Sequence, residues 1–165
     1  LKNIGICIDN ERGFFNKLTG VENLEYYAAH YGLGKLDTLK RIEELETFFK
    51  LGKNLQSYYQ YYSSGNKKRL ALMRAFLHDP SILILDEITD NLDPIFREKM
   101  LAYLLNHGKE KGKIILFATQ RIEEAEQLCS HAILLNRGRM VYSLKAEEFK
   151  GRLSNFYRES QELKS

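Results

Sequence analysis

The feature that most constrains the fold is an apolar run that ends in two acidic residues. Residues 82–85 are Ile-Leu-Ile-Leu, and Asp86 and Glu87 follow directly. Such an unbroken apolar run is typical of a strand buried on both faces of a parallel sheet. Because the carboxyl ends of parallel strands face the ligand crevice of an α/β fold, both acids are placed to bind a metal ion and a water molecule. Taken alone, the same residues also fit the beginning of a surface turn.

The segments around this strand alternate between helix and strand, which predicts an α/β fold with a parallel core sheet. The pattern predicts helices at 66–78, 94–108 and 122–129, and further strands at 113–119, 132–135 and 140–144. The turn chemistry of residues 136–139 favours a hairpin between the last two strands. A charged helix on the outside of the domain is predicted from Ala146 onward.

The part of the chain before Ser63 is predicted to be mainly helical. Thr19 and Glu22 have the spacing of a capping box, and apolar residues at helical spacing predict helices at 21–31 and 37–51. The aromatic run at 58–62 favours packing between helices or against a partner, because aromatic side chains dominate core burial. Stacking on a base or another ligand is the alternative for this run.

Composition excludes several classes of protein. The length of 165 residues and the hydrophobic share of 44% fit one globular domain with its own core. The net charge of +3, from 25 basic and 22 acidic residues, is too balanced to indicate a nucleic-acid partner. No apolar run approaches the roughly 20 residues that a membrane-spanning helix needs.

The cysteines indicate the redox environment of the protein, and the first residues indicate where the chain begins relative to its first strand. Cys7 and Cys129 are far apart in the sequence and have no metal ligands at a suitable spacing, which favours a reducing, cytoplasmic environment. The chain begins at Leu1 rather than at a methionine and enters a strand-like stretch at 3–8. We therefore expect it to be a fragment.

Two further motifs flank the acidic strand. Upstream, Ser63, Ser64, Gly65 and Asn66 precede a helix, whose free backbone N–H groups and positive dipole end form a potential anion site. Taken alone, this tetrapeptide is more typical of a plain helix N-cap with a basic first turn. Downstream, residues 89–94 form an acidic turn with proline at the first helical position.

In this order and spacing, the motifs resemble the ABC transporter ATP-binding subunits, and the resemblance covers nearly the whole chain. Residues 63–66 resemble the family's signature LSGGQ, residues 82–87 its Walker B strand with the catalytic glutamate, and residues 91–93 its D-loop. Residues 4–33 resemble the Q-loop and the start of the helical subdomain. Their sequence is most similar to that of exporter-type subunits whose permease is a separate chain. Thr119 and Gln120 resemble the switch-histidine loop.

The resemblance implies an ABC-type P-loop NTPase fold that is truncated at its N-terminus and has a parallel core sheet and a helical subdomain. The implied parts are a Q-loop region at 1–18, a helical subdomain at 19–62, and a core part with the signature, Walker B, D-loop and switch loop at 63–145. A C-terminal helix is implied at 146–165.

The resemblance also implies a site shared by two subunits that pair head to tail. Ser63, Ser64, Gly65 and Asn66 would contact ATP held by the partner subunit. Asp86, and with it Asp9, would hold Mg²⁺. Glu87 would act as the general base, and Gln120 and Asp93 would complete the catalytic set.

The partners implied by the resemblance place the protein at the cytoplasmic face of a membrane. They are a second ABC ATPase subunit and a separate membrane permease, and no nucleic acid. Phe14 and Phe15 are candidates for the permease contact, although core packing fits either residue as well.

One family motif has no counterpart in these residues. The Walker A loop, Gly-x-x-x-x-Gly-Lys-Ser/Thr, is expected upstream of Leu1, since the Gly-Lys pairs in the chain lack both the earlier glycine and the following hydroxyl residue. Without that loop, the β- and γ-phosphates lose their backbone N–H donors. We expect the 165 residues alone to bind MgATP weakly or not at all, and micromolar affinity in isothermal titration would contradict this.

Two substitutions within the matched motifs bear on turnover. Gln120 stands where the family has a histidine, and an amide donates a hydrogen bond but carries no charge and shuttles no proton. Asp9 aligns with the Q-loop glutamine, with Asn10 as the alternative by one residue. A carboxylate at that position can bind Mg²⁺ but adds negative charge near the phosphates.

Three functions remain open at this point. The leading hypothesis is an ATPase subunit that powers transport, and its similarity to exporter-type subunits favours export. The second is a degenerate subunit that dimerises and regulates without hydrolysis, which Gln120 and Asp9 favour and Glu87 opposes. The third is an ABC-type ATPase of DNA repair or chromosome structure, which would need a long coiled coil that residues 36–62 are too short to supply.

Overall fold

The computed structural model describes residues 2–8 and 13–162. These residues form two compact units, which meet in sequence between Ala118 and Thr119. The first unit contains β1 (Ile4–Cys7), α1 (Gly20–Tyr31), α2 (Lys35–Phe49), η1 (Gly52–Gln56), η2 (Tyr59–Tyr61), α3 (Ser64–Phe76), β2 (Ile82–Asp86), α4 (Pro94–Lys111) and β3 (Ile114–Ala118). The second contains α5 (Ile122–Leu128), β4 (His131–Asn136), β5 (Arg139–Lys145), α6 (Ala146–Phe149) and α7 (Leu153–Glu162).

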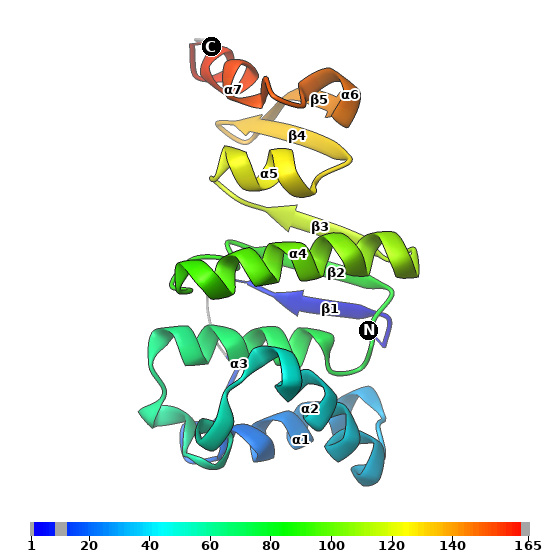
Figure 1. The fold of residues 1–165 in the computed structure, drawn as a ribbon, viewed down its shortest axis with the longest axis vertical. Coiled ribbons are helices and arrows are strands. Elements are labelled where there is room, and N and C mark those ends of the chain that lie inside the picture. The colour runs from blue at the N-terminus through cyan, green and yellow to red at the C-terminus, as the bar shows by residue number, and fades with distance from the viewer. Residues whose placement is uncertain (1, 9–12, 163–165) are drawn as a thin grey trace. The chain divides into compact units, whose positions relative to one another are not determined.

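The first unit is built on a parallel three-stranded sheet with β2 between β1 and β3 (Figure 1). Ile6 is in register with Ile84 and Leu116, and Asp86 pairs with Ala118. The predicted parallel sheet is therefore confirmed. The strand that ends in the two acids is its central strand, so its carboxyl end lies in the middle of one sheet edge.

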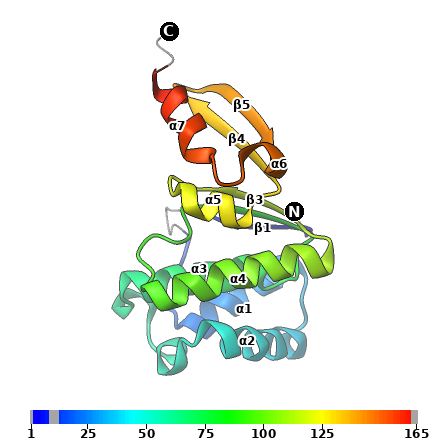
Figure 2. The same ribbon diagram turned by 45° about the horizontal axis from the view of Figure 1, so that its top comes forward.

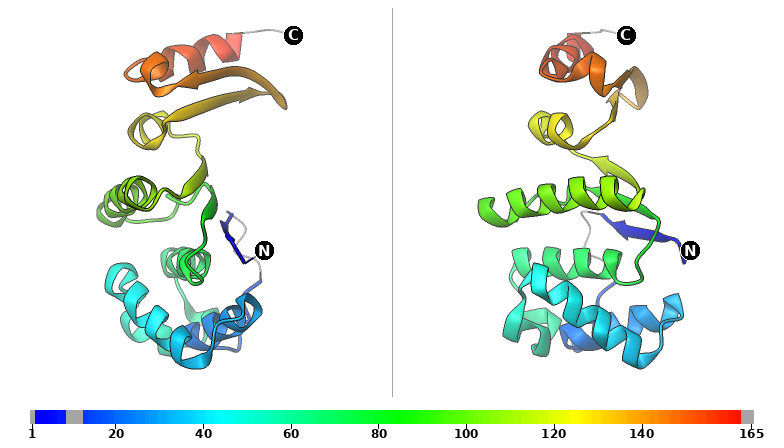
Figure 3. Two further views of the ribbon diagram at one scale, coloured as in Figure 1. Left: turned by 90° about the vertical axis from the view of Figure 1, so that its right-hand side faces the viewer. Right: turned by 45° about the vertical axis from the view of Figure 1, so that its right-hand side comes forward.

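One face of this sheet is buried under helices. Cys7, Leu83 and Leu85 are at most 1% exposed, and Figure 3 shows α3 and α4 on the same side of the sheet. The backbone of α3 comes so close to β1 that a Cβ on Gly5 would lie 2.1 Å from the carbonyl oxygen of Ala75. Only glycine fits at this point of β1.

The other face of the sheet is not covered by the described residues. Ile6, Ile114 and Leu116 are between 40% and 64% exposed, and Ile82 and Ile84 are half-buried. The prediction of a strand at 82–85 is confirmed, but the prediction that it is buried on both faces is wrong. Hydrophobic character alone does not tell which face a neighbouring element covers.

The helical part of the first unit packs around α3. Helix α3 buries residues on several sides, including Leu70, Leu72, Met73 and Phe76, and α1 and α2 lie beside it (Figure 2). The predicted capping box of α1 is present, since the Thr19 Oγ1 accepts the Glu22 N–H at 3.1 Å and the Glu22 carboxylate accepts the Thr19 N–H at 2.7 Å. Helix α1 ends at Gly32, which has a left-handed φ of 82°.

The aromatic run at 58–62 divides between the core and the surface. Tyr59 and Tyr62 are buried, whereas Tyr58 and Tyr61 are 49% and 73% exposed. Phe14 stacks on Tyr59 with ring centroids 4.8 Å apart. The packing interpretation of this run is confirmed for its two buried tyrosines.

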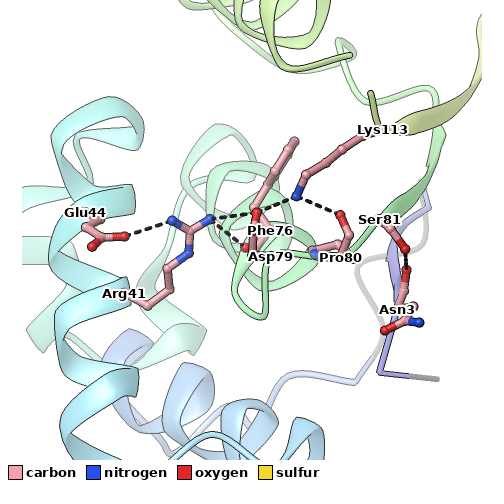
Figure 4. A network of polar contacts seen from close by, with 8 residues as sticks. All are labelled: Asn3, Arg41, Glu44, Phe76, Asp79, Pro80, Ser81 and Lys113. Atoms are coloured by element: carbon pink, nitrogen blue, oxygen red, sulfur yellow. Dashed lines mark hydrogen bonds and ion pairs between the residues drawn. The ribbon is translucent and has the colours of Figure 1, made fainter. Parts of the chain in front are cut away.

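A polar network ties α2 to the amino edge of the sheet, opposite the acids (Figure 4). The Arg41 guanidinium donates to the carbonyl oxygen of Phe76 at 3.2 Å and lies 3.8 Å from the Asp79 carboxylate. The Lys113 ammonium pairs with the same carboxylate and donates to the Pro80 carbonyl oxygen at 2.9 Å. The shared carboxylate therefore connects α2, the end of α3 and the start of β3.

The second unit is a β-hairpin with helices packed on one face. Strands β4 and β5 pair antiparallel through a turn in which Arg137 and Gly138 have φ values of 48° and 76°, as their turn chemistry predicted. The buried hydrophobic side chains of this unit are Ala132, Leu144, Phe149 and Leu153. Among the described helices of the chain, none is both long and apolar enough to cross a bilayer.

The prediction of one outer helix from Ala146 onward is wrong in two respects. The segment forms two helices, α6 and α7, with a break at Gly151, whose φ is 76°. A positive φ interrupts a right-handed helix, and glycine adopts it without a steric penalty. The flanking Phe149 and Leu153 are at most 1% exposed, which makes the segment part of the core of the second unit.

Candidate functional site

The two acids lie at the carboxyl edge of the parallel sheet. Asp86 is the last residue of β2 and is half-buried, and Glu87 follows it. The Glu87 N–H donates to the Ala118 carbonyl oxygen at 3.0 Å, which continues the ladder with β3 by one residue. Both acids therefore stand on a backbone that the central strand holds in place.

The turn after the acids has an unusual backbone. Glu87 and Asn91 have φ values of 46° and 62°, in the left-handed region that non-glycine residues rarely adopt. Ile88 and Thr89, between them, are at most 2% exposed. We name residues 87–93 the acid turn. Such strain persists only where the surroundings over-determine the conformation, and it clusters at functional sites.

Asp93 closes the acid turn and starts α4. One carboxylate oxygen accepts the Phe96 N–H at 2.9 Å, and the other pairs with the Arg69 guanidinium at 2.7 Å. The hydrogen bond from the Phe96 backbone, followed by Arg69, holds the pKa of Asp93 below its usual range. Asp93 is therefore both an N-cap and one half of an ion pair.

The signature tip, residues 63–66, begins α3. The Ser63 Oγ accepts the Asn66 N–H at 3.3 Å as the N-cap, and Ser63 and Ser64 are exposed. A Cβ on Gly65 would lie 3.1 Å from the Asn91 carbonyl oxygen, so the tip lies directly beside the acid turn. The first unit thus brings together an exposed helix start and the turn that follows the acids.

The remaining predicted residues are not among the described residues of the first unit. Asp9, and the alternative Asn10, fall outside the described residues. Gln120 belongs to the second unit and is exposed, next to Thr119, whose hydroxyl accepts the Arg121 N–H at 3.0 Å and donates to Glu124.

The described residues fit Mg²⁺ in part. They contain no cluster of three or more side chains that could enclose a metal ion. Magnesium in nucleotide sites is typically bound by one or two carboxylates together with substrate phosphates and water, and Asp86 offers one such carboxylate at the end of β2. The donor set therefore fits a magnesium ion that arrives with a nucleotide.

Two features of the site were not found by sequence reasoning. Arg69 contacts Asp93 across 24 positions of the sequence, and no local pattern marks that pair. The positive φ of Glu87 is also not signalled, because neither glycine nor asparagine stands there.

Comparison with known proteins decides the family. A family model described as ABC transporter matches residues 1–90, which run from β1 through the signature tip to the acids. The chain belongs to the ABC transporter family. The resemblance seen in the motifs is thereby confirmed.

Curated ABC relatives match most of the chain. It is 33% identical over 143 residues to the ABC transporter ATP-binding protein NatA of Bacillus subtilis, a match that covers 84% of this chain and 56% of the relative. It is 32% identical over 157 residues to the bacitracin transport ATP-binding protein BcrA of Bacillus licheniformis, covering 92% of this chain and 48% of the relative. The chain spans about half the length of these relatives.

Solved structures confirm the ABC ATPase fold. The ATP-binding subunit of an ABC transporter superimposes with a TM-score of 0.85 at 28% identity, covering 97% of this chain and 69% of that one. A dimeric ATP-binding cassette in a post-hydrolysis state, bound to ADP and Pi, has a TM-score of 0.79 at 24% identity and covers 89% of this chain and 64% of that one.

Proposed function

We propose that the protein containing these residues binds and hydrolyses MgATP and uses the energy to drive export through a separate membrane permease. The observation that carries this proposal is the acid pair at the carboxyl end of the central strand, beside an exposed serine-capped helix start. The ABC relatives named as ATP-binding proteins, one of them for bacitracin transport, support it.

The acids divide the chemistry between them. Asp86, at the end of β2, would hold Mg²⁺, which neutralises charge on the transferred phosphoryl group when bound. Glu87, one residue further, would orient the attacking water and accept its proton. The ladder bond from the Glu87 N–H to Ala118 fixes the backbone that carries this carboxylate.

The signature tip would serve a nucleotide held by a second subunit. Ser63, Ser64, Gly65 and Asn66 start a 13-residue helix, whose first N–H groups and positive dipole end attract phosphate. These 165 residues hold no phosphate loop of their own. A solved neighbour of the same fold is a dimer with ADP and Pi, which supports the pairing of two subunits here.

The permease contact is proposed at Phe15 rather than Phe14. Phe15 is 44% exposed and meets Tyr26, itself 41% exposed, edge to face at 4.8 Å. Phe14 instead stacks on the buried Tyr59 and lies under the Arg74 guanidinium. Through such a contact, the protein would act at the cytoplasmic face of the membrane.

Phosphate release decides between this enzyme and a non-hydrolytic regulatory module. The wild-type full-length protein should release phosphate from MgATP faster than its Glu87→Gln variant. Equal rates of phosphate release in the two proteins would contradict the enzyme and favour the non-hydrolytic regulatory module.

Gln120 should slow turnover, and Gln120→His is expected to raise kcat several-fold. A histidine donates a hydrogen bond to the γ-phosphate as the amide does, but it can also carry a positive charge and transfer a proton. Proton transfer by a well-placed side chain raises the rate by about 10²-fold or more. Steady-state phosphate release measures the effect. Gln127→His, on the exposed face of α5, is the matched control and should leave kcat unchanged. A Gln120→His rate at or below that of the wild type would contradict a role for this position.

A further inference from the structure

Arg69 connects three elements of the first unit. It lies in the second turn of α3, and its side chain is only 19% exposed. The guanidinium pairs with Asp93 at 2.7 Å, donates to the Phe49 carbonyl oxygen at 3.1 Å and lies 4.0 Å from the centre of the Phe96 ring. One side chain of the signature helix therefore holds the end of α2 and the start of α4.

The acid turn is anchored at both ends. At its beginning, the Glu87 N–H is bonded to Ala118. At its end, Asp93 is bonded to the Phe96 backbone and to Arg69. Between these anchors, the Asn91 carbonyl oxygen lies directly beside Gly65 of the signature tip.

The strain of the acid turn makes its far anchor important. Glu87 and Asn91 hold left-handed backbone conformations, which relax when the surroundings no longer enforce them. The ladder bond to Ala118 holds only the first residue of the turn, so loss of the Arg69 contact at Asp93 is expected to let residues 88–92 relax and to shift the Glu87 side chain.

We propose that Arg69 is a positioning residue that joins the signature tip to the acid turn and so fixes Glu87 for hydrolysis. This inference rests on the proposed function.

A purely structural ion pair predicts a different outcome. The Asp93 carboxylate is 52% exposed, and exposed ion pairs contribute little to stability. If Arg69 only stabilised the fold, its loss would leave kcat nearly unchanged. If it positions Glu87, kcat falls while thermal stability changes little.

The test uses the full-length protein with Arg69→Gln, Asp93→Asn and the double variant. Asparagine retains the N-cap bond to Phe96 and removes only the ionic partner. Since small displacements of reacting groups cost up to about 10²-fold in rate, each single variant is expected to lower kcat by roughly tenfold with KM nearly unchanged. The double variant should be no slower than Arg69→Gln. The control is Arg74→Gln on the same helix, whose guanidinium packs over Phe14 and Tyr27.

Additive losses in the double variant, a change confined to KM, or an unchanged kcat in folded variants would overturn the proposal. Hydrogen exchange of the amides in residues 87–93 provides the second readout and does not depend on turnover. Arg69→Gln should accelerate this exchange, and Arg74→Gln should not. If the wild type proves to be no faster than Glu87→Gln, the proposed function fails, and unchanged exchange in Arg69→Gln would then overturn the link as well.

Discussion

Replacement of Glu87 by glutamine in the full-length protein is expected to lower kcat for MgATP hydrolysis by about 10²–10⁴-fold, the usual contribution of a general base. Glutamine keeps the size of the side chain but accepts no proton from the attacking water. The backbone of residue 87 is held by its own N–H bond to Ala118, so the turn should be retained. Steady-state phosphate release and direct MgATP binding measure the two steps separately.

The expected pattern is loss of turnover with nucleotide binding retained. Glu147→Gln is the matched control, because Glu147 is exposed on α6 and lies in the second unit. Its kcat should equal that of the wild type. If Glu87→Gln hydrolyses MgATP at the wild-type rate, Glu87 is not the base and the division of roles between the two acids is wrong.

Replacement of Phe76 by alanine is expected to lower the free energy of unfolding by about 3–5 kcal/mol, the usual cost of removing a buried phenyl ring. Phe76 is 1% exposed and contacts Phe49 of α2 as well as Tyr103 and His107 of α4. The cavity would open where three helices of the first unit meet. Urea unfolding followed by circular dichroism measures the change in midpoint.

The control for this substitution is an exposed aromatic residue. Tyr61 is 73% exposed, and Tyr61→Ala should change the free energy of unfolding by less than about 0.5 kcal/mol, as surface substitutions usually do. A loss below about 1 kcal/mol for Phe76→Ala would show that this ring does not hold the helices together, and the described core would need revision.

Short-range chemistry made part of this structure predictable from sequence. The capping box of Thr19 and Glu22, the serine cap of α3 and the hairpin turn at Gly138 each depend on residues a few positions apart. The strand that ends in Asp86 could be predicted for the same reason, because the acids directly follow its apolar run. For the same reason, the motifs of the family could be matched before the fold was known.

Contacts between distant segments were beyond that reasoning. The pair of Arg69 and Asp93, the tight approach of Gly5 to Ala75, and the open face around Leu116 all depend on how helices pack on the sheet. The single C-terminal helix was wrong because Gly151 adopts a left-handed conformation within a polar, helix-compatible segment. The roles proposed for Asp86, Glu87 and Gln120 come from the family resemblance and stay predictions.

The structure of the full-length Glu87→Gln protein with MgATP, determined by crystallography or electron cryomicroscopy, tests the central claim most directly. The account predicts two subunits with each nucleotide between Ser63 to Asn66 of one subunit and Asp86 of the other. A nucleotide that contacts the signature tip and Asp86 of the same subunit, or that leaves the tip in solvent, would contradict it.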